Sequence, residues 1–207
     1  MNKKAILFLT LPLFSNFSHA EEFEVSANVS LVSNYIFRGV SLSNDEPATQ
    51  GGFDLSHSSG AYLGVWGSSD SGNGEIDFYG GYAFSVSDDF SVDVGVLRYY
   101  YPGVGEHTTE YHIGLSYLDF GFTYYYDETL ESHYYELGYS YELIDKVSLD
   151  LHYGTFSPDE GDDVYDYSLS VSYAFNDSYS VFVGYSDHEE DSEYADGEVF
   201  AGISASF

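Results

Sequence analysis

The sequence predicts an all-β fold, an antiparallel transmembrane β-barrel of about 12 strands behind an N-terminal signal peptide. Three features support this prediction. Apolar and polar residues alternate with a period of two through most of the chain, no segment beyond the first 20 residues has a convincing helical period, and short connections alternate with long ones.

Composition excludes two broad classes of protein. The 207 residues carry 35 acidic and 5 basic side chains, and 43% of them are hydrophobic and 19% aromatic. So much apolar surface demands burial, which excludes a simple disordered acidic chain. With a formal charge of −30, the chain lacks the cluster of basic side chains that binding to phosphates requires, so we expect no nucleic-acid partner.

Residues 1–20 have the three parts of a secretory signal peptide. Lys3 and Lys4 form a positive start, an apolar centre follows, and Ser18-His19-Ala20 forms a small-x-small cleavage site. We therefore divide the chain into a signal peptide, 1–20, and a barrel domain, 21–207. No later stretch reaches the roughly 20 apolar residues of a membrane helix, so any crossing of a membrane would be by strands.

The expected strands are long. In the first, residues 23–37, apolar positions such as Val25 and Leu31 alternate with Ser26 and Ser30. Further alternating runs lie near residues 48–57, 60–69, 74–84, 90–101, 108–117, 119–127, 132–143, 146–155, 164–175, 178–187 and 197–207. A secreted β-sandwich or jelly roll also alternates, but its strands average five or six residues. Many runs here reach the roughly 9–11 residues that a tilted membrane strand needs.

The connections indicate an orientation. Short turns near residues 57–60, 85–89, 118, 144–145 and 176–177 alternate with longer links at 38–47, 70–73, 102–107, 156–163 and 188–196. Tight periplasmic turns and long outer loops are typical of outer-membrane barrels, which places the N-terminus on the periplasmic side. Phe207 ends an alternating strand and resembles the terminal signal that the barrel-assembly machinery reads.

Aromatic residues gather near both ends of the strands on the proposed lipid-facing phase. One rim carries Tyr35, Phe37, Tyr100, Tyr153, Tyr165 and Tyr167, and the other carries Phe84, Phe90, Tyr117, Phe120, Tyr141, Phe175, Tyr179 and Phe207. Two aromatic girdles are expected at the two interfaces of a membrane, which indicates the bacterial outer membrane.

The segment 29–68 carries a resemblance. Residues 29–41 (VSLVSNYIFRGVS), Pro47-Ala48, residues 50–52 (QGG) and residues 64–68 (GVWGS) resemble the opening of the bacterial TorF-type putative porin family. Asn34 stands where that family would have Asp. The resemblance implies an outer-membrane barrel more directly than it implies a transport function, which would be passive diffusion of small solutes.

The phase that would face the lumen is acidic. It carries the proposed pore-lining residues Asp77, Asp93, Glu110, Glu136, Asp150 and Asp166, together with Glu24, Asp54, Glu75 and Glu142, and Arg38 is the one plausible inward base, at the outer mouth. A narrow tube lined by one sign of charge concentrates the opposite ion, so this pattern predicts a porin-like channel for small cationic or polar solutes. The alternative is that lumen residues only need to be polar. A structural or adhesive barrel with a closed lumen is a second class of function.

An outer-membrane hydrolase is the third class. His112 or His152 with Asp150, or His57 with Ser56, could form part of a Ser-His-Asp set, but serine is abundant enough for such sets to arise by chance. We therefore expect no enzymatic activity and no catalytic residue. No close ligand spacing predicts a metal site, and no cofactor is expected.

Two acidic segments and one arginine point outward. Residues 159–163 and 188–193 could hold Ca²⁺ loosely, although neither has the spacing of a known calcium loop. Arg98 lies on the lipid-facing phase near the outer end of its strand, where it could bind lipopolysaccharide phosphates, unless a local bulge turns it inward. The expected partners are thus membrane lipid, lipopolysaccharide, the assembly machinery and small solutes, and the sequence leaves the oligomeric state open.

Overall fold

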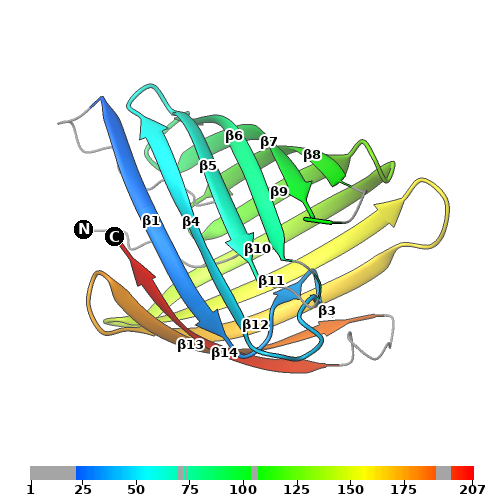
Figure 1. Cartoon of the computed structure of the whole chain (residues 1–207). Coiled ribbons are helices and arrows are strands. Elements are labelled where there is room, and N and C mark those ends of the chain that lie inside the picture. Colours follow the sequence, from blue (N-terminus) through cyan, green and yellow to red (C-terminus); the bar gives the residue numbers. More distant parts are fainter. Residues whose placement is uncertain (1–21, 70–71, 73, 104–106, 190–196) are drawn as a thin grey trace.

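The computed structural model describes residues 22–69, 72, 74–103, 107–189 and 197–207. They form a closed antiparallel barrel of 12 strands, in which β1 pairs with β14 and every other wall strand pairs with its neighbours along the chain (Figure 1). The wall strands are β1 (Phe23–Val32), β4 (Ala48–His57), β5 (Ala61–Ser68), β6 (Glu75–Ser85), β7 (Phe90–Tyr100), β8 (His107–Tyr117), β9 (Phe120–Asp127), β10 (Ser132–Ile144), β11 (Val147–Pro158), β12 (Val164–Ala174), β13 (Tyr179–His188) and β14 (Glu198–Ser206). The prediction of about 12 antiparallel strands is confirmed.

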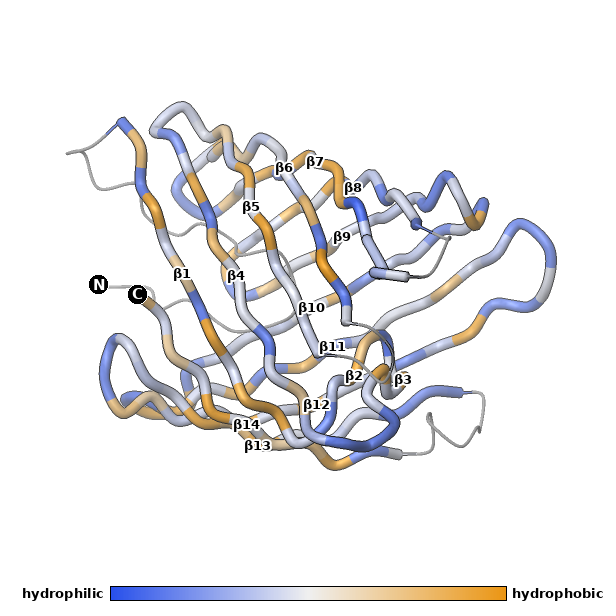
Figure 2. Tube along the Cα trace, viewed as in Figure 1, coloured by the Kyte–Doolittle hydropathy of each residue, from blue (hydrophilic) through white to orange (hydrophobic). Residues whose placement is uncertain are grey.

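Side chains alternate between the two faces of the wall, and Figure 2 shows apolar and polar positions interleaved along each strand. Large apolar side chains point outward and are exposed, as at Leu31, Phe53 and Val183. Polar and acidic side chains point inward and are buried, as at Asp54 and Ser204. This arrangement inverts that of a water-soluble protein, and it suits a hydrocarbon solvent outside the barrel. The described residues contain no helix that is long and apolar enough to cross a membrane.

The seam of the barrel joins the first and last strands. Asn28 lies opposite Ser206, and the backbone N–H of Phe207 donates to the carbonyl of Ala27 at 2.9 Å. Ser30 and Ser204 share a side-chain hydrogen bond of 2.8 Å across the same seam, on the lumenal face. Closure leaves no unpaired edge, so every wall strand has two hydrogen-bonded neighbours.

The predicted first strand, 23–37, is wrong in its last part. The wall strand ends at Val32, and residues beyond it turn inward to form a short hairpin of β2 (Ile36–Phe37) and β3 (Val40–Ser41). Tyr35 and Phe37, predicted for the outer girdle, therefore lie inside the barrel, where Tyr35 is only 1% exposed. The physical reason is a set of local polar contacts that competes with strand pairing.

Asn34 is the centre of those contacts. Its Oδ1 accepts hydrogen bonds from Ser41 Oγ at 2.6 Å and Ser43 Oγ at 3.0 Å, and its Nδ2 donates to Asp45 Oδ1 at 2.9 Å. The backbone N–H of Tyr35 donates to Ser43 Oγ at 2.9 Å. Side-chain bonds of this kind offer the backbone an alternative to the sheet ladder, and here they fold the link between β1 and β4 back on itself.

The outward direction of the other girdle aromatics is confirmed. Tyr100, Tyr153, Tyr165 and Tyr167 are exposed near the end of the barrel that carries the long links. Most of the other set is exposed near the end that carries the tight turns: Phe84, Tyr117, Phe120, Tyr141, Phe175, Tyr179 and Phe207, with Phe90 half-buried. The expected signal peptide, residues 1–20, lies outside the described residues.

Candidate functional site in the barrel lumen

The lumenal face carries most of the proposed pore-lining acids. Among them, Asp77, Glu110, Glu136, Asp150 and Asp166 are buried inside the wall. Asp93 also points inward and is half-buried. Of the four further acids on the predicted inward phase, Asp54 and Glu75 are buried, while Glu24 and Glu142 lie near the tight-turn end and are exposed.

The β2–β3 hairpin brings a base into this acidic interior. Its two-residue turn is Arg38-Gly39, with φ of 50° and 80°, between the paired residues Phe37 and Val40. Positive φ at both central positions is the pattern of a type I′ turn, which matches the twist of a two-stranded ribbon. A Cβ added at Gly39 would lie 2.9 Å from Asp166 Cβ, so the turn is pressed against the inner wall.

The Arg38 guanidinium lies in a cage of one carboxylate and three aromatic rings. Nη1 and Nη2 donate to the two oxygens of Glu110 at 2.8 and 3.0 Å, a bidentate ion pair. Cζ lies 3.9 Å from the ring centre of Tyr134, 5.3 Å from that of Tyr125 and 4.7 Å from that of Phe37. Burial alone would lower the pKa of Arg38, but attraction by Glu110 outweighs it and the pKa is raised, so the group stays charged.

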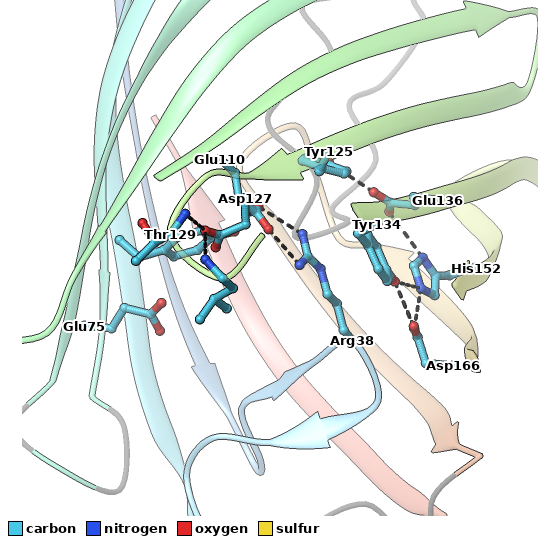
Figure 3. Close-up of polar contacts among 12 residues, drawn as sticks. Arg38, Glu75, Glu110, Tyr125, Asp127, Thr129, Tyr134, Glu136, His152 and Asp166 are labelled. Carbon is cyan, nitrogen blue, oxygen red and sulfur yellow. Dashed lines mark hydrogen bonds and ion pairs between the residues drawn. The ribbon is translucent and has the colours of Figure 1, made fainter. Parts of the chain in front are cut away.

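A chain of tyrosines and acids continues from this cage around the outer half of the lumen (Figure 3). Tyr125 donates to Glu136 Oε2 at 3.1 Å, and Glu136 Oε1 lies 3.2 Å from His152 Nδ1. His152 Nε2 in turn lies 2.6 Å from Asp166 Oδ1, which also accepts a hydrogen bond from the Tyr134 hydroxyl at 3.1 Å. These links hold the rings and carboxylates of β9 to β12 in one orientation.

A second tyrosine–acid group lies on β6, two strands from the β8 strand that carries Glu110. Tyr35 and Tyr101 donate to the two oxygens of Glu75 at 2.8 and 3.1 Å, so the hairpin link is fastened to β6 as well. Among the described residues, Asp77 Oδ1 and Gln50 Nε2 have no hydrogen-bond partner within the protein. Buried polar atoms of this kind bind water or a solute, which fits an aqueous lumen.

The half of the lumen near the tight turns holds the other two predicted acids. Asp93 accepts from the Tyr62 hydroxyl at 2.9 Å and lies 2.8 Å from His112 Nε2, while Asp150 accepts a short hydrogen bond from Ser140. The structure thus brings the predicted residues to one lumen, but it divides them between two halves. Arg38 reaches only the half near the long links, which the sequence predicts to be the outer half, and there it pairs with Glu110.

Sequence reasoning missed the lumenal tyrosines. Tyr99, Tyr125 and Tyr134 are at most 8% exposed. Tyr99 shares the inward phase of Asp93 and Tyr134 that of Glu136, while the strand of Tyr125 carries none of the predicted acids. The same alternation could have found them. The sequence analysis interpreted the outward aromatic residues as membrane girdles and did not assign the inward ones.

The histidines and acids of the candidate hydrolase sets have other partners. Asp150 contacts Ser140, whereas His152 contacts Asp166, and His112 contacts Asp93. His57 Nδ1 lies 2.8 Å from the hydroxyl of Ser59 at an exposed turn. These contacts tie strands and turns together, and the described residues hold no group of three or more His, Cys, Asp or Glu arranged around a metal ion.

The outward-facing predictions have partial support. Arg98 stands on the outer face of β7, and its Nη1 donates to Thr109 Oγ1 at 2.5 Å, so no bulge turns it into the lumen. In the acidic segment 159–163, Asp163 accepts from Ser157 Oγ at 2.6 Å and Asp159 lies 3.4 Å from His133. Most of segment 188–193 lies outside the described residues. Binding of lipopolysaccharide or Ca²⁺ stays a prediction.

Solved structures of similar fold include two porins and a further outer-membrane protein. A KdgM porin superposes with a TM-score of 0.69 at 9% identity, covering 88% of this chain and 99% of that one. A NanC porin gives 0.65 at 12% identity, covering 89% and 99%, and the Acinetobacter baumannii outer-membrane protein Omp33 gives 0.54 at 11%, covering 90% and 97%. At these identities the likeness concerns the fold. Among curated proteins there is no match.

The family assignment comes from the sequence itself. Residues 17–205 match one bacterial family along nearly the whole chain. The porins of similar fold agree with the barrel that the resemblance implied, and the TorF-type assignment stays an expectation. The chain belongs to the family described as "Bacterial protein of unknown function (Gcw_chp)".

Proposed function

We propose that this protein is a narrow outer-membrane channel of porin type, through which small polar solutes diffuse with a preference for cations. The observation that carries the proposal is the sign of the charge inside the wall. Inward carboxylates line β4, β6, β7, β8, β10, β11 and β12, whereas only Arg38 of the described arginines and lysines, Arg38, Arg98 and Lys146, lies in the lumen. The lumenal imidazoles of His112 and His152 each contact a carboxylate. A tube of one sign concentrates the opposite ion.

The outer surface supports the membrane part of the proposal. Exposed Leu, Val, Ile and Phe cover the barrel between two sets of aromatic side chains, which would be costly in water and is favourable in a bilayer. The porins of similar fold support the same location, and so does the resemblance of residues 29–68 to TorF-type putative porins.

A closed structural barrel is the second candidate, because the hairpin occupies part of the lumen. Tyr35 at 1% and Asp166 at 2% exposure are packed as tightly as a protein core. Elsewhere the lumen is roomier, since a Cβ added at Gly121 or Gly138 would meet nothing within 4 Å. The hairpin is thus a constriction in the outer half, and ionic current distinguishes a constricted pore from a closed barrel.

Planar-bilayer recording tests the proposal. The purified barrel should give discrete conductance steps, and its reversal potential across a KCl gradient should show that K⁺ is favoured over Cl⁻. Neutralising Asp93, Glu136 and Asp150 as Asn, Gln and Asn should reduce the preference. At about 8 Å in water each carboxylate favours K⁺ and disfavours Cl⁻ by roughly 0.5 kcal/mol. Three of them change the partition of each ion by about tenfold, and the permeability ratio by on the order of a hundredfold.

The control variant removes the same charge outside the lumen. Asp88, Asp89 and Asp177 are exposed at tight turns, and changing all three to Asn should leave the selectivity nearly unchanged. The preference should also fade as the Debye length falls from about 30 Å at 0.01 M salt to about 3 Å at 1 M. Absence of current would support the closed barrel, and an anion-selective current would overturn the proposed selectivity.

A further inference from the structure

The walls of the Arg38 cage belong to the barrel. Glu110 comes from β8, Tyr125 from β9 and Tyr134 from β10, three consecutive strands of the wall. The hairpin contributes Arg38 itself and the ring of Phe37. Withdrawal of the hairpin would therefore leave the carboxylate and two of the three rings in place, fixed by the sheet.

Neighbouring side chains hold these walls in position without Arg38. Tyr99 donates to Glu110 Oε2 at 2.8 Å, so the carboxylate keeps one partner. The Tyr134 hydroxyl is bonded to Asp166 at 2.9 Å, and the Tyr125 hydroxyl is bonded to Glu136 at 3.1 Å. A site in which both the anion and the ring faces are fixed in advance binds a cation with little loss of side-chain entropy.

The chemistry of the cage selects a planar, weakly hydrated cation. The two oxygens of Glu110 accept a parallel pair of N–H bonds, which is the geometry of a guanidinium group. Arg38 Cζ lies over the ring of Tyr134, 3.9 Å from its centre, which is a close cation–π contact. A small, strongly hydrated ion such as K⁺ gains less from the ring faces and would have to give up its water.

The groups around the cage keep its net charge negative. Glu110, Glu136 and Asp166 face it from β8, β10 and β12, with His152 between the last two. Even with the imidazole protonated, three carboxylates outnumber the one cation that the wall supplies. An arriving cation therefore meets an attractive field after the Arg38 charge is removed.

We propose that this cage is a binding site for a solute that carries a guanidinium or alkylammonium group, and that Arg38 occupies it as a tethered stand-in. The physiological use of the site, as a selective station for organic cations on their way through the lumen, rests on the proposed channel function. Binding itself does not depend on it. A solute cation and Arg38 exclude each other, so occupancy by the solute releases the tip of the hairpin.

Tethering sets the strength of that competition. A group held on a short link acts at an effective concentration in the millimolar range or above. Methylguanidinium should therefore bind the native barrel weakly, and removal of the arginine side chain should strengthen the binding at least tenfold. Arg38→Gly is the suitable change, because a φ of 50° suits glycine and the turn keeps its shape.

Isothermal titration calorimetry of the purified, folded barrel in detergent tests the site directly. The probe is methylguanidinium chloride at constant ionic strength, with neutral urea, which has nearly the same shape, and KCl as controls. We expect at least tenfold tighter binding to Arg38→Gly than to the native protein. We also expect at least tenfold weaker binding to Arg38→Gly/Glu110→Gln, and weak or no binding of urea and K⁺. Arg38→Asn, which removes the charge and tolerates a positive φ, serves the same comparison if the glycine variant does not fold.

Equal binding to the native protein and Arg38→Gly would overturn the proposal, as would binding that ignores the Glu110 change. The result of this binding test can be distinguished from the result of the channel test. Methylguanidinium binding without any ionic current would reject the channel and keep the site, whereas a cation-selective current without binding would reject the site alone.

Discussion

Gly39→Ala should release the hairpin from the wall, and the structure gives the size of the effect. Gly39 has a φ of 80°, where an L-residue costs about 1–2 kcal/mol. An added Cβ would also lie 2.9 Å from Asp166 Cβ, from the Asp187 carbonyl oxygen and from His188 Cβ. None of these atoms is the free end of a flexible side chain, and forced overpacking costs about 1–3 kcal/mol. A total near 3 kcal/mol corresponds to roughly a hundredfold rise in the released fraction.

Thiol labelling measures that fraction, because the chain contains no cysteine. Ser41→Cys places one nearly isosteric thiol in β3, at a position that is 5% exposed while the hairpin is docked. Reaction with a water-soluble methanethiosulfonate reagent then requires release, so its rate follows the released population. In the Ser41→Cys background, Gly39→Ala should raise the rate by up to about a hundredfold.

Gly138→Ala is the matched control. It makes the same chemical change on the lumenal face of β10, where an added Cβ meets nothing within 4 Å, and it should leave the rate unchanged within about twofold. Resistance of each folded barrel to heat-induced unfolding in detergent checks that the wall is intact. Equal rates in the Gly39→Ala protein and its parent would refute the idea that close contact at Gly39 fixes the hairpin.

Three further predictions concern orientation, closure and the outer surface. A protease-sensitive tag inserted in 159–163 should be cleaved on intact cells and one at 176–177 should not, and equal cleavage would reject the assigned orientation. Phe207→Asp should slow assembly and lower the amount of barrel in the outer membrane several-fold on quantitative blotting, because Phe207 closes the seam and is 70% exposed to the proposed lipid; a normal level would show that this aromatic is not needed. Arg98→Gln should reduce the lipopolysaccharide that co-purifies with the barrel, since one cation on the outer face is lost, and an unchanged ratio would remove Arg98 from the lipid contact.

The wall was predictable because one local rule governs it. A strand with lipid on one side and a polar lumen on the other must alternate, so residues such as Val94 and Asp93 reveal their directions independently of the rest of the fold. The bounds of β4, Ala48–His57, agree with the predicted run, and the burial of its side chains alternates as the same rule requires. The same alternation identified the acidic residues that face the lumen.

The hairpin was not predictable from that rule, since its sequence continues the alternation. Tyr35 and Phe37 occupy the same phase as Leu31, but their partners, Glu75 and Tyr99, lie on strands that are distant in sequence. Only the turn carries a local signal, a residue followed by glycine between two extended pairs, and Arg38-Gly39 is a less common form of that signal than Asn-Gly. Tertiary contact inside the barrel decides the fold of this segment.

In the proposed channel, the position of Arg38 on the hairpin, and not on the wall, links the width of the pore to its charge. While Arg38 is docked, it neutralises Glu110 and its hairpin narrows the outer half of the lumen. Release removes the obstruction and exposes one more unpaired carboxylate, so conductance and cation preference should rise together in Gly39→Ala channels. Bilayer recordings at 0.01 M salt, where the field of Glu110 is least screened, provide the measurement. A larger conductance with unchanged selectivity would mean that Arg38 still pairs with Glu110 after the change, and that the hairpin moves without giving up its ion pair.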